Sequence, residues 1–152
     1  MAKTVLMVCA GNTCRSPMAE VLLRRLVDER LPETAKDVTV ASAGLSGCDG
    51  CPANPNAVSA VAELGLDLSG HVARRLTKKM IDGADLILTM QACQVPLVLE
   101  IDPSAANKTR PIGDSDIGDP IGGSIDDYRR TRDQIRSALE GVLDLLQTGG
   151  TS

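Results

Sequence analysis

The stretch 5–17, Val-Leu-Met-Val-Cys-Ala-Gly-Asn-Thr-Cys-Arg-Ser-Pro, constrains the fold more than any other part of this chain. Its first four residues are all apolar, which is typical of a strand covered on both faces. Ser16 and Pro17 favour a helix start, because serine can cap the first turn and proline fits its first position. The stretch therefore predicts a buried strand, a tight loop and a helix in immediate succession.

The predicted loop has the composition of an oxyanion site. Gly11 and Asn12 tolerate the positive φ that a loop needs if its backbone N–H groups are to converge on one point. Such N–H groups at a helix N-terminus bind phosphate-like anions, and Arg15 can bind two phosphate oxygens with its planar guanidinium. Cys9 begins the loop, where the helix dipole, the amides and Arg15 favour a thiolate. The pattern indicates attack of a cysteine sulfur on phosphorus.

The string Cys-x5-Arg-Ser-Pro, with Gly11, Asn12 and Cys14 inside it, resembles the phosphate-binding loop of the low-molecular-weight protein tyrosine phosphatases. Its position at the end of an N-terminal strand makes the resemblance specific. The alternative, a structural cysteine beside a surface arginine, is weaker in this context. The resemblance implies a phosphocysteine intermediate, with the phosphate held by Ala10, Gly11, Asn12, Thr13, Cys14 and Ser16.

The composition is that of an ordinary soluble globular domain, with 43% hydrophobic and 24% charged residues among 152. A net charge of −4 provides no general basic surface for nucleic acid. No apolar run is long enough for a membrane span, and the N-terminal run lacks a cleavage pattern. Five cysteines, an odd number, without an export signal favour a reduced, cytoplasmic chain.

Short apolar runs alternate with helical patterns along the chain, which is typical of a parallel α/β domain. Strands are expected at 5–8, 38–40, 84–90 and 109–112, and helices at 17–30, 54–64, 76–81, 91–100 and, after a Ser124-x-x-Asp127 capping box, to 146. With the family resemblance, the expected fold class is α/β: a single domain with a four-stranded parallel sheet flanked by helices on both faces, Rossmann-like. We expect this phosphatase domain to cover 1–148, with 149–152 as a loose tail.

Residues 118–124, Gly-Asp-Pro-Ile-Gly-Gly-Ser, provide a candidate acid. A departing group needs a proton, and Pro120 stiffens the chain beside Asp119 while the glycines allow close approach to a ligand. By itself the segment is better interpreted as a plain turn, because Asp-Pro and Gly-Gly are common turn residues. Its position resembles the Asp-Pro acid of the family, which implies that Asp119 protonates the leaving group and later activates water.

The substrate is indicated by what the chain lacks. Tyrosine-directed members of the family usually carry an aromatic residue after Asp-Pro, but here Ile121 stands there, and the chain has no Phe or Trp. Its single tyrosine, Tyr128, falls on the apolar stripe of the last predicted helix. Residues 9–20 and 119–126 are similar to the bacterial protein arginine phosphatase branch, which implies phosphoarginine as substrate. In that branch Thr13 determines specificity, because a small polar side chain leaves room for a guanidinium; the alternative is that Thr13 only shapes the loop.

Other residues are expected to support the loop. The resemblance implies that Ser16 bonds the cysteine sulfur, and that Asn12, Ser42 and His71 form a network that holds the loop, with His71 structural and not a base. Cys14 can form a reversible disulfide with Cys9, which would protect the nucleophile from over-oxidation. Two further cysteines make a Cys-x-x-Cys that is too small for zinc, so a labile disulfide and two free thiols both remain open: Cys48 and Cys51.

Four functions compete for this pattern. Protein arginine phosphatase ranks first and protein tyrosine phosphatase of the same family second. A thiol-dependent arsenate reductase would need more cysteines than Cys93 provides, and a non-catalytic phosphate sensor would not need Cys9, Arg15 and Asp119 together. We expect phosphorylated proteins as substrates, no nucleic acid or membrane partner, a monomer, and no cofactor or metal, because Arg15 and the loop amides supply positive charge. The resemblance further implies an opposing arginine kinase.

Overall fold

Four parallel strands form the centre of the molecule, as the alternating pattern predicts. The computed structural model describes residues 2–148, so the expected tail at 149–152 lies outside the described residues. The strand order is β2-β1-β3-β4. The strands are β1 (Lys3–Cys9), β2 (Val38–Gly44), β3 (Leu86–Thr89) and β4 (Thr109–Pro111). β2 continues to Gly44, four residues beyond the expected strand, because it pairs with β1 along its whole length, from Lys3↔Val38 to Cys9↔Gly44.

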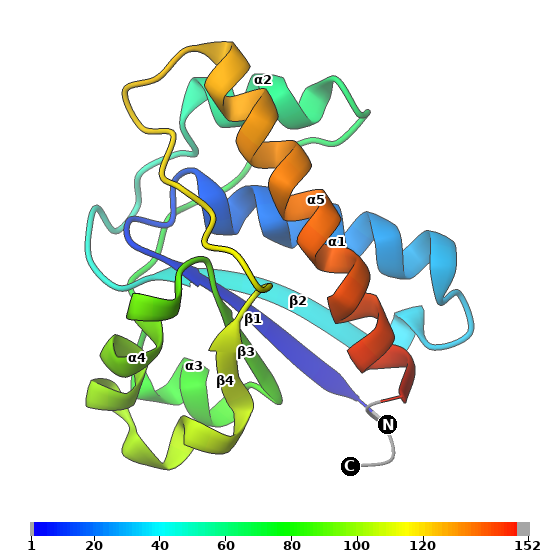
Figure 1. Cartoon of the computed structure of the whole chain (residues 1–152), viewed down its shortest axis with the longest axis vertical. Helices are drawn as coiled ribbons and strands as arrows, with labels where there is room; N and C mark the ends of the chain where they lie inside the picture. The colour runs from blue at the N-terminus through cyan, green and yellow to red at the C-terminus, as the bar shows by residue number, and fades with distance from the viewer. Residues whose placement is uncertain (1, 149–152) are drawn as a thin grey trace.

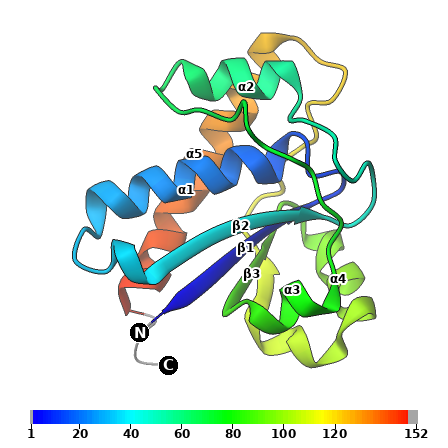
Figure 2. The ribbon, with the colours of Figure 1, turned by 180° about the vertical axis from the view of Figure 1, so that it is seen from behind.

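Helices cover both faces of this sheet (Figure 1). The helices are α1 (Arg15–Arg30), α2 (Pro55–Ala62), α3 (Lys78–Gly83), α4 (Val95–Ile101) and α5 (Ile125–Thr148), with 3-10 turns η1 (Ala35–Asp37), η2 (Ala92–Gln94) and η3 (Pro103–Lys108). α1, α2 and α5 lie on one face, and α3 and α4 on the other, as the view from behind also shows (Figure 2). Within residues 2–148, no helix has the length and apolar character needed to cross a membrane.

β1 is the buried strand that its apolar run predicts. Val5, Met7 and Cys9 belong to the larger core, beneath α1 and α5. Leu6 and Val8 alternate with them and belong to the smaller core, on the side of α3 and α4. All five side chains are at most 2% exposed, because successive residues of a strand point to opposite faces of the sheet.

The helix starts are confirmed in part. Asn54 caps α2 by accepting from the N–H of Asn56, and Ser124 and Asp127 form the expected capping box of α5. The expected helix 91–100 is instead the 3-10 turn η2 followed by α4. This difference follows from Pro96, which has no N–H to donate and therefore lies in the first turn of α4.

The expected cap of α1 is wrong. The helix already begins at Arg15, after Cys14, and its first turn has no side-chain cap. Ser16 is therefore inside the helix, and its hydroxyl points to the sulfur of Cys9 at 2.9 Å. The prediction failed because a serine before a proline is a general helix-start signal, whereas here the hydroxyl has a partner from the end of β1.

Candidate active site

The loop between β1 and α1 lies at the carboxyl edge of the sheet, where parallel α/β sheets commonly bind ligands. Asn12 has a φ of 59° and is the only non-glycine residue in the described range with positive φ. Gly11, the other residue of the loop that tolerates positive φ, does not adopt it. The loop therefore turns on Asn12 alone, a residue type that tolerates this conformation.

Two glycines outside the motif allow the loop to pack tightly. A Cβ on Gly44, at the end of β2, would lie 2.9 Å from the carbonyl oxygen of Ala10, and one on Gly47 would lie 3.1 Å from the Cα of Gly11. The first distance is shorter than real Cβ contacts allow, and the second would require the backbone to shift, at a residue whose φ of 109° also disfavours a side chain. The segment after β2 also donates from the N–H of Leu45 to the Cys9 carbonyl. The loop is thus packed against the backbone at 44–47, which lies outside the sequence motif.

Cys9 lies at the bottom of a small pocket. The pocket has a volume of about 40 Å³, and its lining residues are Cys9, Gly11, Thr13, Cys14, Arg15, Asp119 and Ile121. The Cys9 sulfur lies 2.9 Å from the Ser16 hydroxyl and accepts from the Asn12 N–H at 3.3 Å. Both groups can donate a hydrogen bond to a thiolate, as the nucleophilic interpretation requires.

Arg15 and Asp119 meet at this pocket, although 104 positions separate them in the sequence numbering. Arg15 is 2% exposed, and its Nη2 lies 3.6 Å from Oδ2 of Asp119, whose side chain is 39% exposed. Asp119 Oδ1 accepts from the N–H of Ile121, which orients the carboxylate. Arg15 Nη1 donates to Oε1 of Gln91 and to the carbonyl of Ile117, both at 2.8 Å. Neither acceptor was found from the sequence.

The predicted supporting network is also brought together. Asn12 Nδ2 donates to the hydroxyls of Ser16 at 2.8 Å and Ser42 at 3.0 Å, and the Asn12 carbonyl lies 2.8 Å from Nε2 of His71. Two members were missed: the N–H of Arg74 donates to Asn12 Oδ1, and the Ser42 hydroxyl donates to Glu20. Every polar atom of the Asn12 side chain is therefore bonded, and the residue is fully buried.

Cys14 lines the same pocket as Cys9 but has a different environment. Its sulfur lies 3.4 Å from the hydroxyl of Tyr128, whose ring is buried on α5. Burial raises the pKa of the Cys14 thiol, although the hydrogen bond from Tyr128 opposes this. Burial also raises the pKa of Tyr128, with the contact to Cys14 acting in the same direction. Burial therefore disfavours the thiolate form of Cys14 beside the pocket.

Cys48 and Cys51, for which the sequence left two alternatives, form a disulfide. They lie in the segment between β2 and α2, which contacts both the loop and the chain at 71–75. The Asn54 N–H donates to the Thr13 carbonyl, and the Ala73 N–H donates to the Cys51 carbonyl. Cys93 is a free, exposed thiol in η2. Within residues 2–148, no three His, Cys, Asp or Glu side chains are grouped to hold a metal ion.

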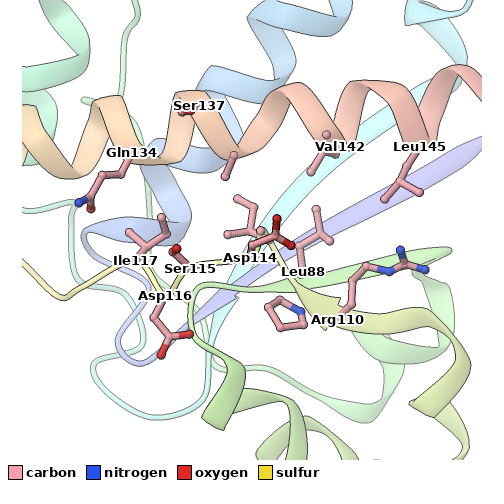
Figure 3. A pocket seen from close by; sticks show the side chains of 15 residues that line it. Leu88, Arg110, Asp114, Ser115, Asp116, Ile117, Gln134, Ser137, Val142 and Leu145 are labelled. Atoms are coloured by element: carbon pink, nitrogen blue, oxygen red, sulfur yellow. The ribbon is translucent and has the colours of Figure 1, made fainter.

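A larger groove of about 910 Å³ lies between α5 and the segment that follows β4 (Figure 3). Gln134, Ser137 and Val142 line it from α5, while Asp114 and Ile117 line it from the opposite side. None of its lining residues is a cysteine, so it contains no nucleophile of the predicted kind. Ile117 lines this groove, and its carbonyl accepts a hydrogen bond from Arg15, which lines the Cys9 pocket.

Comparison with known proteins gives one consistent family. A family model described as low molecular weight phosphotyrosine protein phosphatase matches residues 4–150. The chain is 39% identical to a probable low molecular weight protein-tyrosine-phosphatase of Ralstonia nicotianae, over 98% of this chain and 92% of that protein. It is 36% identical to the protein-arginine-phosphatase of Geobacillus stearothermophilus, over 97% of this chain and 99% of that protein.

Solved structures agree with the sequence relatives. The arginine phosphatase from Geobacillus stearothermophilus superposes with a TM-score of 0.86 at 35% identity, covering 97% of this chain and 94% of that chain. The tyrosine phosphatase from Erwinia amylovora superposes with a TM-score of 0.83 at 34% identity, covering 95% of this chain and 93% of that chain. A third neighbour is a cysteine-to-serine mutant of an arginine phosphatase with a phosphorylated active-site serine, at 33% identity over 95% of this chain and 96% of that chain, with a TM-score of 0.86.

Proposed function

The chain belongs to the low molecular weight phosphotyrosine protein phosphatase family, and on this premise we propose that it removes phosphate from phosphoarginine in proteins, with Cys9 as nucleophile. Membership makes it a phosphatase with a catalytic cysteine. We further propose that phosphoarginine is preferred over phosphotyrosine, and we assign a role to each residue of the Cys9 pocket.

The lining of the Cys9 pocket carries the substrate assignment. Its lining includes Thr13, Asp119 and Ile121, and no aromatic ring lines it. A phosphotyrosine ring is best held between flat apolar groups, whereas the N–H groups of a guanidino group are best held by a carboxyl oxygen. Asp119 lines the pocket with its side chain 39% exposed, so one carboxyl oxygen can accept from the guanidino group while the other carries the proton for the leaving nitrogen. The small Thr13 leaves room for the guanidinium beside it.

Each residue of the pocket then has a step in the reaction. The Cys9 thiolate attacks phosphorus while Arg15 binds two of the phosphoryl oxygens. The phosphorus–nitrogen bond breaks, and the departing guanidine nitrogen takes a proton from the Asp119 carboxyl group. The resulting Asp119 carboxylate removes a proton from water, which attacks phosphorus and breaks the sulfur–phosphorus bond. Ser16 donates a hydrogen bond to the departing sulfur, and phosphate is released.

The test compares turnover of a phosphoarginine peptide with that of a phosphotyrosine peptide of the same sequence context, in reductant. Wild type should prefer phosphoarginine, and Thr13→Ile should lose most of that preference because the larger side chain fills the pocket mouth. Thr39→Ile, an exposed position on β2, is the matched control and should keep it. A wild-type preference for phosphotyrosine would overturn the substrate assignment while leaving the cysteine mechanism in place.

Protein tyrosine phosphatase is the second candidate. Ile121 favours it, because this side chain is 64% exposed beside the pocket and offers apolar surface to a ring. Arsenate reduction has less support: Cys93 does not line the Cys9 pocket, and Cys48 and Cys51 are bonded to each other. The non-catalytic sensor is excluded by the family's activity.

We also propose that oxidation of Cys9 regulates the activity reversibly and that the protein acts in the cytoplasm. A peroxide would oxidise the Cys9 thiolate to a sulfenic acid, and the Cys14 thiol would then displace water to form a disulfide that a dithiol reductant restores. Without Cys14, excess peroxide would oxidise the Cys9 sulfenic acid further to a sulfinic acid, which dithiothreitol does not reduce. After prolonged treatment with excess peroxide, dithiothreitol should therefore restore activity in wild type but not in Cys14→Ser; equal recovery of both would contradict this role. A thiol enzyme of this kind fits the cytoplasm, where we expect it to act as a monomer on phosphorylated proteins.

A further inference from the structure

Gln91 contacts the guanidinium of Arg15, although no sequence motif marks it. It lies two residues after the end of β3, at the same edge of the sheet as the loop after β1. Its Oε1 accepts from Arg15 Nη1 at 2.8 Å, and its own carbonyl accepts from the hydroxyl of Thr89 at 2.8 Å. Gln91 therefore contacts Nη1 of Arg15 from a short turn that is hydrogen-bonded to the end of β3.

The hydrogen-bond donors of Arg15 can be counted. A guanidinium has five N–H bonds, two of them on Nη1. Nη1 donates at 2.8 Å to both Gln91 Oε1 and the Ile117 carbonyl, so both of its N–H bonds are used within the protein. The Nε–H and the Nη2 group form the remaining edge, which can donate two parallel bonds to a phosphoryl group. Gln91 and Ile117 thus select which edge faces the pocket.

The amide of Gln91 is itself held in place by Gln94. Gln94 Nε2 donates to Gln91 Oε1 at 3.4 Å, and Gln94 Oε1 accepts from the Gln91 N–H at 3.0 Å. Gln94 is only 4% exposed, so this partner has little freedom to move. Arg15 and Gln94 both present donors, which requires the oxygen of the Gln91 amide, not its nitrogen, to face them.

The two acceptors of Arg15 Nη1, the Gln91 amide oxygen and the Ile117 carbonyl oxygen, are uncharged. Within residues 2–148, the one carboxylate in ion-pair distance of its guanidinium is Asp119, at 3.6 Å. A carboxylate at position 91 could hold the guanidinium equally well, but it would cancel part of the positive charge. An amide orients the cation and leaves its charge available to a phosphate dianion.

We propose that Gln91, supported by Gln94, is a positioning residue of the phosphatase reaction: it fixes the plane of the Arg15 guanidinium toward the phosphoryl group and adds no negative charge of its own beside it. This inference rests on the proposed function, in which Arg15 binds the phosphoryl oxygens. Gln91 does not touch substrate, and its effect passes entirely through Arg15.

Two variants of nearly the same size separate its two roles. Gln91→Leu removes the acceptor, and Gln91→Glu keeps an acceptor but adds negative charge. Gln147→Leu, an exposed position on α5, is the matched control. We would measure kcat and KM with a small phosphorylated substrate, the inhibition constant of inorganic phosphate, and Tm for each protein.

Both Gln91 variants should bind inorganic phosphate about tenfold more weakly and lose about tenfold in kcat/KM. Gln91→Leu loses one hydrogen bond to the charged Arg15, and Gln91→Glu places one negative charge beside it; either change is expected to have about this effect. Gln91→Glu should do so without a lower Tm, because its carboxylate still satisfies Arg15. A purely structural role predicts the reverse, a lower Tm for Gln91→Leu and normal phosphate affinity for both folded variants. The control should match wild type in all three measurements.

Phosphate affinity within twofold of wild type in both folded variants would overturn the inference. Phosphate binding can be measured by calorimetry without turnover, so the result stands apart from the proposed function. A wild type that binds phosphate but hydrolyses no phosphorylated peptide would count against the function, and the Gln91 comparison would still decide the positioning role.

Discussion

Replacing Asn12 with alanine should show how much the loop depends on one side chain. Asn12 is fully buried, has a φ of 59°, and makes three side-chain hydrogen bonds: to Ser16, to Ser42 and from the Arg74 N–H. Alanine removes all three bonds and accepts the left-handed conformation less readily than asparagine. The loop should therefore lose both stability and shape in Asn12→Ala.

The size of the effect follows from these contacts. Three lost hydrogen bonds at about 1 kcal/mol each, with about 1 kcal/mol for alanine at positive φ, give about 4 kcal/mol of lost unfolding free energy. For a domain of this length each kcal/mol lowers Tm by about 2–4 °C, so Tm should fall by about 12 °C. Urea unfolding and calorimetry measure both quantities. Asn107→Ala, an exposed asparagine in η3, is the control and should cost less than about 0.5 kcal/mol.

A double-mutant cycle with Ser42 tests the reasoning directly. Ser42→Ala should destabilise wild type by about 1 kcal/mol more than it destabilises Asn12→Ala, because the shared hydrogen bond is already absent in that background. Strictly additive effects, or a loss below about 1 kcal/mol for Asn12→Ala alone, would refute the view that this network holds the loop.

Four further outcomes are expected. Cys9→Ser should abolish turnover yet still bind inorganic phosphate in a thermal-shift assay; normal activity would end the cysteine mechanism. Asp119→Asn should lower kcat by about 100-fold or more in steady-state kinetics, while Asp114→Asn in the larger groove should not. Joint replacement of Cys48 and Cys51 by serine should lower the unfolding free energy by about 2 kcal/mol in urea, an effect that reductant reproduces in wild type. Glu63 has its pKa lowered to about 2, chiefly by hydrogen bonds from α5 arginines. A lowered pKa stabilises the fold above the ordinary value of 4.5 and ceases to do so as the pH falls to about 2. Wild type should therefore be more stable than Glu63→Gln at pH 6, with the difference vanishing toward pH 2.

Local signals in the sequence identified the fold class and the chemistry. The apolar run of β1, the positive φ of Asn12 and the capping box of α5 each depend on residues within a few positions of one another. The motif from Cys9 to Arg15 is likewise contiguous, so its spacing alone brings sulfur and guanidinium into one turn. Such features are read from sequence because the backbone geometry that they need is set by their immediate neighbours.

Local signals misled where a neighbour from another element decided the outcome. Ser16 looked like a helix cap, but its hydroxyl faces the sulfur of Cys9. Gly11 is the glycine of the motif, but the close backbone approach that requires glycine occurs at Gly44 and Gly47, which pack against the loop. Sequence spacing does not reveal contacts between a loop and a strand end more than thirty positions away.

The sequence by itself determined the parallel α/β class and, with the family resemblance, predicted the nucleophile, the cation and the acid. Only the tertiary structure decided what orients them. Gln91 and Ile117, which accept hydrogen bonds from Arg15, follow β3 and β4, and Arg74, whose N–H donates to Asn12, lies on a segment between α2 and α3. Parallel pairing brings the ends of β1, β3 and β4 to one edge, and only there do these polar groups meet. A single amide or carbonyl has no spacing pattern of its own, so its role becomes visible only when the sheet has placed it beside its partner.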